Sequence, residues 1–126
     1  MNIPEELRYS SDHEWARLEG ANVRIGITDF AQDNLGDVVF VQLPEVGTVV
    51  EANVSFSEVE STKSVSDIYA PVGGTIVEVN AELESTPELL NRDPYGEGWI
   101  CVIETSDPSE LDSLLDAAKY RALITD

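Results

Sequence analysis

Cysteine and histidine are almost absent from this sequence. Among its 126 residues there is one cysteine, Cys101, and one histidine, His13. A lone cysteine excludes an intramolecular disulfide, and one residue of each kind cannot supply a metal site built from several thiolate or imidazole ligands. Cys101 lies in the apolar run "WICVI", so we expect a small buried residue rather than a nucleophile. No metal site is predicted.

Basic residues are scarce as well. Seven Lys and Arg stand against 25 Asp and Glu, which gives a formal net charge of −18. Nucleic acids and anionic membranes attract proteins mainly through basic side chains, so neither is expected as a partner. The acidic residues are spread along the chain. They either form an ordinary solvated surface or select basic surfaces on partner proteins.

Long apolar runs are missing. No segment approaches the length of a transmembrane helix, and the opening "MNIPEELRYS" has the pattern of neither a signal peptide nor a transit peptide. We therefore expect a soluble intracellular protein, cytoplasmic in a bacterium or located in the mitochondrial matrix if the source is eukaryotic. The length of the chain predicts one domain over residues 1–126.

Catalytic motifs are missing too. The glycines stand singly in turns rather than in a phosphate-binding loop, and no nucleophile elbow occurs. His13 beside Glu14 is the one candidate for general-base chemistry, but the favoured interpretation is a strand histidine with a satisfied hydrogen bond. The sequence therefore favours a protein that is not an enzyme.

The chain does contain short alternating and apolar segments separated by turn residues, a pattern typical of a mainly β fold. We expect short antiparallel strands in two small sheets that form a sandwich or flattened barrel, with helices at the periphery. The predicted strands lie within residues 13–19, 22–28, 37–44, 54–60, 65–71, 75–80 and 99–105, and a further short strand is expected between a turn at residues 45–47 and Val54.

Helix signals frame these strands. Thr28 or Asp29 can cap a short helix that Gly36 ends in the left-handed conformation, and one helical turn is expected within residues 86–98. Asp107 followed by Pro108 starts a C-terminal helix, or two, that packs on the sheet. Its apolar residues at helical spacing are Leu111, Leu114, Leu115 and Ala118.

One lysine stands out. The chain has two lysines, and Lys63 lies in a turn, Ser61 to Ser64, that contains no glycine although hairpin tips usually do. Small polar residues leave the lysine unobstructed, and acidic residues flank it. Spacing alone leaves two interpretations open: an ordinary solvated lysine, or a lysine displayed for enzymatic acylation. The flanking acidic residues are Glu58, Glu60 and Asp67.

The whole chain resembles the glycine cleavage system H protein family. The segments that carry the resemblance are "HEW", "IGITDFAQDNLGDVVFVQLPEVG", "ESTKSVSDIYAPVGG" and "ELLNRDPYGEGW". The resemblance implies a lipoyl/biotinyl-carrier-type fold, the barrel-sandwich hybrid, with lipoate attached covalently to Lys63. It implies that the modifying enzyme reads the turn formed by Glu60, Ser61, Thr62, Ser64 and Asp67.

The resemblance also implies a cleft near the "HEW" strand that shelters the loaded arm. Our hypothesis is that Glu14 and Asp67 hold the ammonium of an aminomethyl cargo there by charge-assisted hydrogen bonds. Asn34 stands where some relatives carry a histidine. The residues expected at this cleft are His13, Glu14, Asn34 and Asp67.

Partners follow from the same resemblance. A pyridoxal-phosphate glycine decarboxylase would load the aminomethyl group, an aminomethyltransferase would pass its methylene to tetrahydrofolate, and a dihydrolipoamide dehydrogenase would reoxidise the dithiol. A lipoate ligase or an octanoyltransferase would modify the lysine. Such a shuttle suits a monomer. A plain acidic interaction module and a lipoate relay without glycine cleavage are the alternatives.

Overall fold

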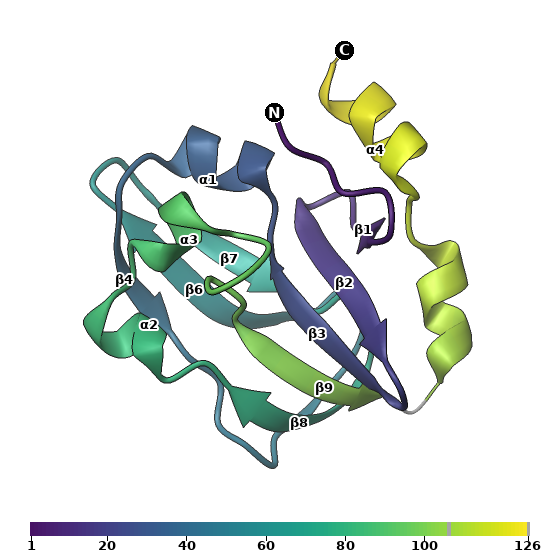
Figure 1. Cartoon of the computed structure of the whole chain (residues 1–126). Coiled ribbons are helices and arrows are strands. Elements are labelled where there is room, and N and C mark those ends of the chain that lie inside the picture. The colour runs from purple at the N-terminus through teal and green to yellow at the C-terminus, as the bar shows by residue number, and fades with distance from the viewer. Residues whose placement is uncertain (106, 126) are drawn as a thin grey trace.

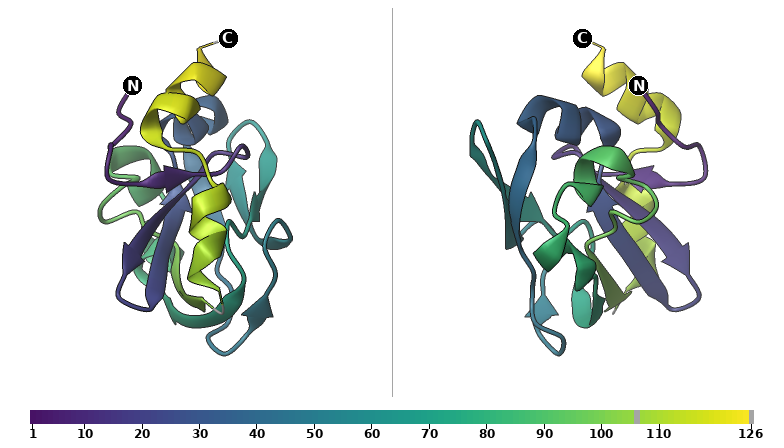
Figure 2. Two further views of the ribbon diagram at one scale, coloured as in Figure 1. Left: turned by 90° about the vertical axis from the view of Figure 1, so that its right-hand side faces the viewer. Right: turned by 60° about the vertical axis from the view of Figure 1, so that its left-hand side comes forward.

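The computed structural model describes residues 1–105 and 107–125, and it shows two antiparallel sheets facing each other with short helices around them (Figures 1 and 2). This is the predicted mainly β sandwich. The strands are β1 (Arg8–Tyr9), β2 (Glu14–Glu19), β3 (Asn22–Ile27), β4 (Val38–Gln42), β5 (Val49–Val50), β6 (Ser55–Ser61), β7 (Val65–Tyr69), β8 (Gly74–Val79) and β9 (Cys101–Thr105).

The larger sheet has six strands in the order β1-β2-β3-β9-β8-β5. Strands β2 and β3 form the predicted hairpin, in which Trp15 faces Gly26. A Cβ atom at Gly26 would lie 2.6 Å from Nε1 of Trp15. The glycine is therefore required here because the indole ring lies directly against the neighbouring backbone.

The smaller sheet has three strands in the order β4-β6-β7. A β-bulge interrupts the pairing of β4 with β6, since Val38 faces Ser61 but Phe40 faces Glu60. The chain passes repeatedly between the sheets, from β3 to β4, back to β5, on to β6 and from β7 to β8. These crossings close the two sheets around one apolar interior.

The interior between the sheets is aliphatic. Val23, Ile25 and Ile27 alternate inward along β3, as the period-2 pattern predicts. A second buried cluster lies where the N-terminal segment, β1 and β2 meet the C-terminal helix; it contains Tyr9 and Tyr120, whose rings stack at 4.6 Å. The two clusters meet at the start of β2, where Trp15 belongs to the second cluster and Ala16 to the first.

The helices surround the sheets (Figure 1). They are α1 (Asp29–Leu35), α2 (Glu82–Ser85), α3 (Leu89–Arg92), a 3-10 helix η1 (Pro108–Ser113) and α4 (Ala117–Ile124). Thr28 is the N-cap of α1, and its side chain accepts a hydrogen bond from the amide of Ala31. Gly36 ends α1 with a positive φ of 78°, but its ψ of −156° lies outside the left-handed helical region that we predicted.

The C-terminal segment forms two helices because the backbone is extended at Leu114 and Leu115 pairs with Tyr9 in a β-bridge. Asp116 then caps α4 by accepting from the amide of Lys119. The prediction that one apolar stripe includes Ala118 is wrong, because the break rotates that residue to the surface. The residues buried in these helices are Leu111, Ala117 and Tyr120. Within the described part of the chain, no helix is long and apolar enough to cross a membrane.

Candidate functional site

Strands β6 and β7 form a hairpin whose tip presents Lys63 to solvent. Glu60 pairs with Val65, so residues 61–64 make the turn. In the right-hand view of Figure 2 this tip stands beside α1 at the edge of the molecule. The prediction of an exposed lysine in a four-residue turn is confirmed.

The side chain of Ser61 organises this turn in place of a glycine. Its Oγ accepts hydrogen bonds from the amides of Lys63 and Ser64, both at 3.1 Å, and donates to the carbonyl oxygen of Ser64 at 3.2 Å. The amide of Ser61 also donates to that carbonyl at 2.8 Å. A serine hydroxyl can satisfy turn amides in this way, so the backbone under Lys63 is ordered although no glycine is present.

A network from α3 supports the turn from one side. The amide of Thr62 donates to the carbonyl oxygen of Asp37 at 3.0 Å. The Asn91 side chain accepts from the amide of Val38 at 2.9 Å and donates to the carbonyl oxygen of Gly36 at 2.8 Å. Asn91 therefore holds residues 36–38, which in turn hold the tip of the hairpin.

The stem of Lys63 lies along Gly36. A Cβ atom at Gly36 would lie 3.0 Å from Cε of Lys63. Over residues 1–105 and 107–125 the ion pairs are those of Glu19 with Arg17 and Arg24, so the ammonium of Lys63 has no carboxylate partner. The amine is thus exposed and free to react.

A groove of about 290 Å³ opens directly beside the turn. Aliphatic side chains make one part of its lining, and polar side chains with two carboxylates, those of Asp12 and Asp67, make the rest. The lining residues are Asp12, His13, Ile27, Ala31, Asn34, Leu35, Ser64, Val65, Ser66, Asp67 and Ile68. The groove can therefore take an apolar chain that carries a cationic group at one end.

His13 stands at the wall of this groove with a φ of 73°, which is uncommon for a residue other than glycine. Its Nδ1 lies 2.9 Å from the hydroxyl oxygen of Tyr120, and that hydroxyl lies 2.7 Å from Oγ1 of Thr28. Burial lowers the pKa of His13, so the ring is neutral near pH 7. The imidazole has a satisfied hydrogen bond, as expected. The expectation that His13 is a strand residue is wrong, because its positive φ places it in a bend just before β2 begins at Glu14.

Glu14 does not line the groove. Its side chain is 1% exposed, accepts a hydrogen bond from Oγ of Ser10 at 2.5 Å and accepts another from the amide of Tyr69 at 3.3 Å. Burial raises the pKa of Glu14 from 4.5 to about 8, because the charged form loses its hydration. The carboxyl group links β2 to β7 and remains protonated near neutral pH.

The structure thus brings together His13, Asn34 and Asp67 at the groove, whereas Glu14 is buried and does not belong to the lining. Sequence reasoning missed two contributors to this site. Asp12 stands next to the "HEW" motif, and its charge and position could have identified it as a groove residue. Asn91 lies far along the chain in a helical turn, where no local pattern marks it as a support of the lysine turn.

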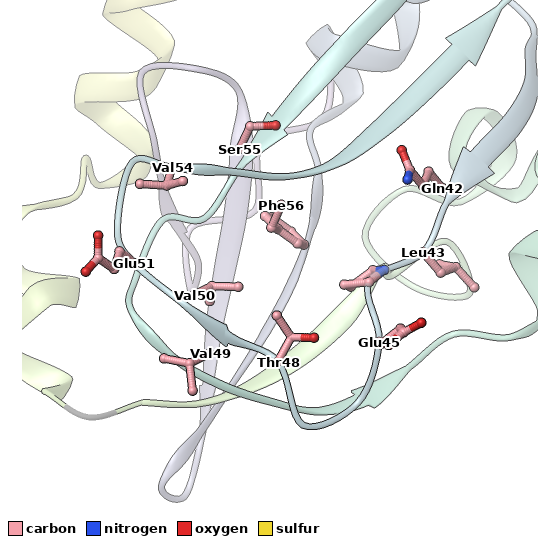
Figure 3. A pocket seen from close by; sticks show the side chains of 11 residues that line it. Gln42, Leu43, Glu45, Thr48, Val49, Val50, Glu51, Val54, Ser55 and Phe56 are labelled. Atoms are coloured by element: carbon pink, nitrogen blue, oxygen red, sulfur yellow. The ribbon is translucent and has the colours of Figure 1, made fainter.

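A larger hollow of about 590 Å³ lies at the other end of the smaller sheet, where β4 ends and β6 begins (Figure 3). Its lining includes Val50, Val54 and Phe56 and contains no Lys, His or Cys. It is separated from Lys63 by the length of β6. Cys101 is buried elsewhere, as predicted, and burial raises the pKa of its thiol to about 12, which argues against nucleophilic chemistry.

Two facing antiparallel sheets with a lysine at an exposed hairpin tip, and a groove next to it, define the class of barrel-sandwich carrier domains. The chain belongs to the glycine cleavage H-protein family, whose sequence profile matches residues 7–126. Lipoyl carriage is the function of this family, which is one of carrier proteins.

Similar proteins agree over the full length. The chain is 59% identical to the glycine cleavage system H protein of Geobacillus thermodenitrificans, over 100% of this chain and 99% of that one. It is 61% identical to the H protein of Symbiobacterium thermophilum, over 96% and 94% of the two chains. The crystal structure of the H protein from Mycobacterium marinum superposes with a TM-score of 0.90 at 45% identity, covering 98% of this chain and 100% of that one.

Proposed function

We propose that residues 1–126 form one lipoyl-carrier domain in which Lys63 bears the lipoyl group by an amide bond. The observation that supports this most directly is the exposed side chain of Lys63 at the tip of an ordered, glycine-free turn. Ser61 orders the turn and Thr62 ties it to Asp37, so a modifying enzyme meets a preformed shape. A lipoate ligase or octanoyltransferase would read Glu60, Ser61, Thr62, Ser64 and Asp67.

The groove next to the turn suits the arm. Acylation removes the charge of the lysine, which makes burial of its stem against Gly36 and the aliphatic lining less costly. When bound, the lipoyl dithiolane supplies the sulfur that takes up and releases the one-carbon unit. Asp12 and Asp67 are placed to accept charge-assisted hydrogen bonds from an ammonium at the end of the arm. A direct contact from Glu14 would require its carboxyl group to leave Ser10 and Tyr69.

As a carrier, the chain serves three enzymes in turn: a pyridoxal-phosphate glycine decarboxylase, an aminomethyltransferase and a dihydrolipoamide dehydrogenase. A tether keeps the reactive end near a docked enzyme at an effective concentration on the order of millimolar. The formal charge of −18 favours basic docking surfaces on these enzymes. We propose that the carrier is a monomer, because each docking event is transient. We also propose that it acts in the bacterial cytoplasm.

The test compares the two lysines of the chain. Lys63→Arg should fold normally and accept no lipoyl group from a lipoate ligase, because a guanidinium does not form the lipoyl amide. Lys119→Arg, at the other exposed lysine, should be modified like the wild type. Intact-mass spectrometry reads both results, and a lipoyl adduct on Lys63→Arg would refute the assignment. Glycine–bicarbonate exchange with the decarboxylase then separates the shuttle from a lipoate relay.

A further inference from the structure

The bulge in β4 exposes two large apolar side chains in succession. Val38 and Val41 are buried, but Val39 is 54% exposed and Phe40 is 50% exposed. In a regular strand the alternation would have turned one of these two side chains inward. The extra residue of the bulge interrupts that alternation, and bulges are frequent beside functional sites because they redirect side chains.

The apolar surface continues across the sheet. Phe40 pairs with Glu60, and Glu60 pairs with Val65, which is 59% exposed. Residues paired in this way project from the same face of a sheet. Phe40 and Val65 therefore project from one face on either side of Glu60. Together with the exposed neighbour Val39 they form an apolar stripe, hereafter the Phe40 stripe, which crosses the sheet immediately below the turn that carries Lys63.

Uncompensated carboxylates accompany this stripe. Glu60 lies within it, and the next row of paired residues contains Glu58 and Asp67. Lys63 is the one Lys or Arg between Arg24 and Arg92. Among residues 1–105 and 107–125, Glu19 is the one carboxylate in an ion pair, so none of the stripe's carboxylates is paired with a basic side chain of these residues. A partner that covers the surface gains from presenting apolar contacts together with Arg or Lys side chains.

The reach of the lysine identifies which partner this must be. The ammonium ends a stem of four carbons, so an enzyme that acylates it must bring its active site close to the backbone of the turn. The sheet face below the turn is then covered as well. Enzymes that act at the far end of the acylated arm do not need this close approach. The Phe40 stripe is thus placed for the modifying enzyme.

We propose that the Phe40 stripe, with Glu58 and Glu60, is the docking surface for the acyltransferase that modifies Lys63. The partner surface has an apolar recess bordered by basic side chains. This inference rests on the proposed function, since it requires Lys63 to be the acylated residue. It adds that the sheet face, and the bulge that exposes it, contribute to recognition together with the turn.

The experiment measures acylation kinetics with a lipoate ligase and the unmodified protein as acceptor. The variant Phe40→Thr/Val65→Thr removes two of the three apolar side chains of the stripe and replaces them with threonine, a β-branched residue suited to strands. The matched control is Val46→Thr/Val49→Thr, which changes two valines that are 61% and 73% exposed and belong to neither the stripe nor the lysine turn. Circular dichroism and thermal unfolding establish that both variants are folded.

We expect kcat/KM of the stripe variant to fall about tenfold or more through a higher KM, as loss of a central apolar contact does, while the control stays near the wild type. Equal kcat/KM in the two variants would overturn the inference. Failure of the wild type to gain a lipoyl group would instead overturn the assignment of Lys63. These two failures are therefore distinguishable.

A second measurement tests the charges. Glu58→Gln should raise KM and weaken its dependence on salt, because a charge pair with the ligase is lost. Glu51→Gln, an exposed glutamate away from the turn that carries Lys63, is the control. An identical salt dependence in both variants and the wild type would remove the electrostatic part of the proposal. The reaction of Lys63 with a small amine-reactive reagent should be unchanged in all of these variants, which shows that the lysine itself remains accessible.

Discussion

The amide of Thr62 donates a hydrogen bond to the carbonyl oxygen of Asp37 at 3.0 Å, which joins the lysine turn to the segment between α1 and β4. The bond starts at the tip of the β6–β7 hairpin, beyond the last pair of residues in the β6–β7 ladder. It makes the position of Lys63 depend on residues 36–38, which Asn91 holds in turn. An exposed turn is thereby kept ordered by a support outside its own hairpin.

Asn91→Ala tests this support. Removing the amide leaves the backbone groups at Gly36 and Val38 without partners, at an expected cost of about 1–3 kcal/mol in the free energy of unfolding. The amide of Thr62 should then exchange its hydrogen faster than the loss of global stability explains. Asn80→Ala is the control, because that side chain also bonds two backbone groups but lies away from the hairpin. Equal exchange at Thr62 in both variants would contradict the role of Asn91.

Gly36→Ala tests the contact of the lysine stem with the end of α1. The backbone at Gly36, with φ of 78° and ψ of −156°, lies in a region that glycine almost alone adopts, so alanine should cost about 1–3 kcal/mol in stability. The new methyl would meet Cε of Lys63 at 3.0 Å, and the flexible stem can move away. Denaturant unfolding should therefore show the loss, whereas acylation of Lys63 continues at the wild-type rate. A Gly36→Ala variant that is folded but acylated at Lys63 more slowly than the wild type would contradict this separation.

Asp67→Asn should shorten the lifetime of the carrier loaded with an aminomethyl cargo. Its carboxylate lines the groove and can hold an ammonium there, whereas an asparagine carries no charge. Asp12→Asn should act in the same direction, because Asp12 lines the same groove. Glu14→Gln should act less, since its carboxyl group lies outside the groove. Release of the cargo over time measures all three, and unchanged lifetimes in both aspartate variants would exclude a carboxylate clamp.

Glu14 should make stability depend on pH. Its pKa is about 8 in the folded protein, against 4.5 for an ordinary glutamate, so between these values the folded state holds a proton that the unfolded state has lost. The free energy of unfolding therefore falls as pH rises through this window, by up to about 1.4 kcal/mol per pH unit. Glu14→Gln should remove that contribution, and the exposed Glu51→Gln should keep it. Urea unfolding from pH 5 to pH 9 gives the comparison, and parallel curves for wild type and Glu14→Gln would contradict a buried, protonated Glu14.

Local patterns predicted much of the fold. Alternation identified β3 and β8, turn residues placed the β2–β3 hairpin, and capping residues marked the start of α1 and η1. The prediction of one apolar stripe in the C-terminal segment is wrong because Leu115 pairs with Tyr9, which is far away in the chain. This pairing interrupts the helix. The bulge at Val39 was also beyond prediction, because it depends on how β4 aligns with β6.

By itself, the sequence determined that Lys63 would be displayed. A lone lysine in a small polar turn between two strands is exposed wherever the hairpin lies, because turn residues of this kind have no apolar surface to bury. The sequence likewise determined the excess of acidic charge that faces any partner. These properties depend on neighbours in the chain, and neighbours in the chain can be read directly.

Only the tertiary structure decided what surrounds that lysine. The groove joins Asp12, Asn34 and Asp67 from three separate segments, and Glu14 is withdrawn from it by bonds to Ser10 and Tyr69. Burial then changes the ionisation of Glu14, which no local pattern encodes. The physical reason is that desolvation and long-range hydrogen bonds arise from contacts between distant segments, and those contacts exist only once the two sheets have closed.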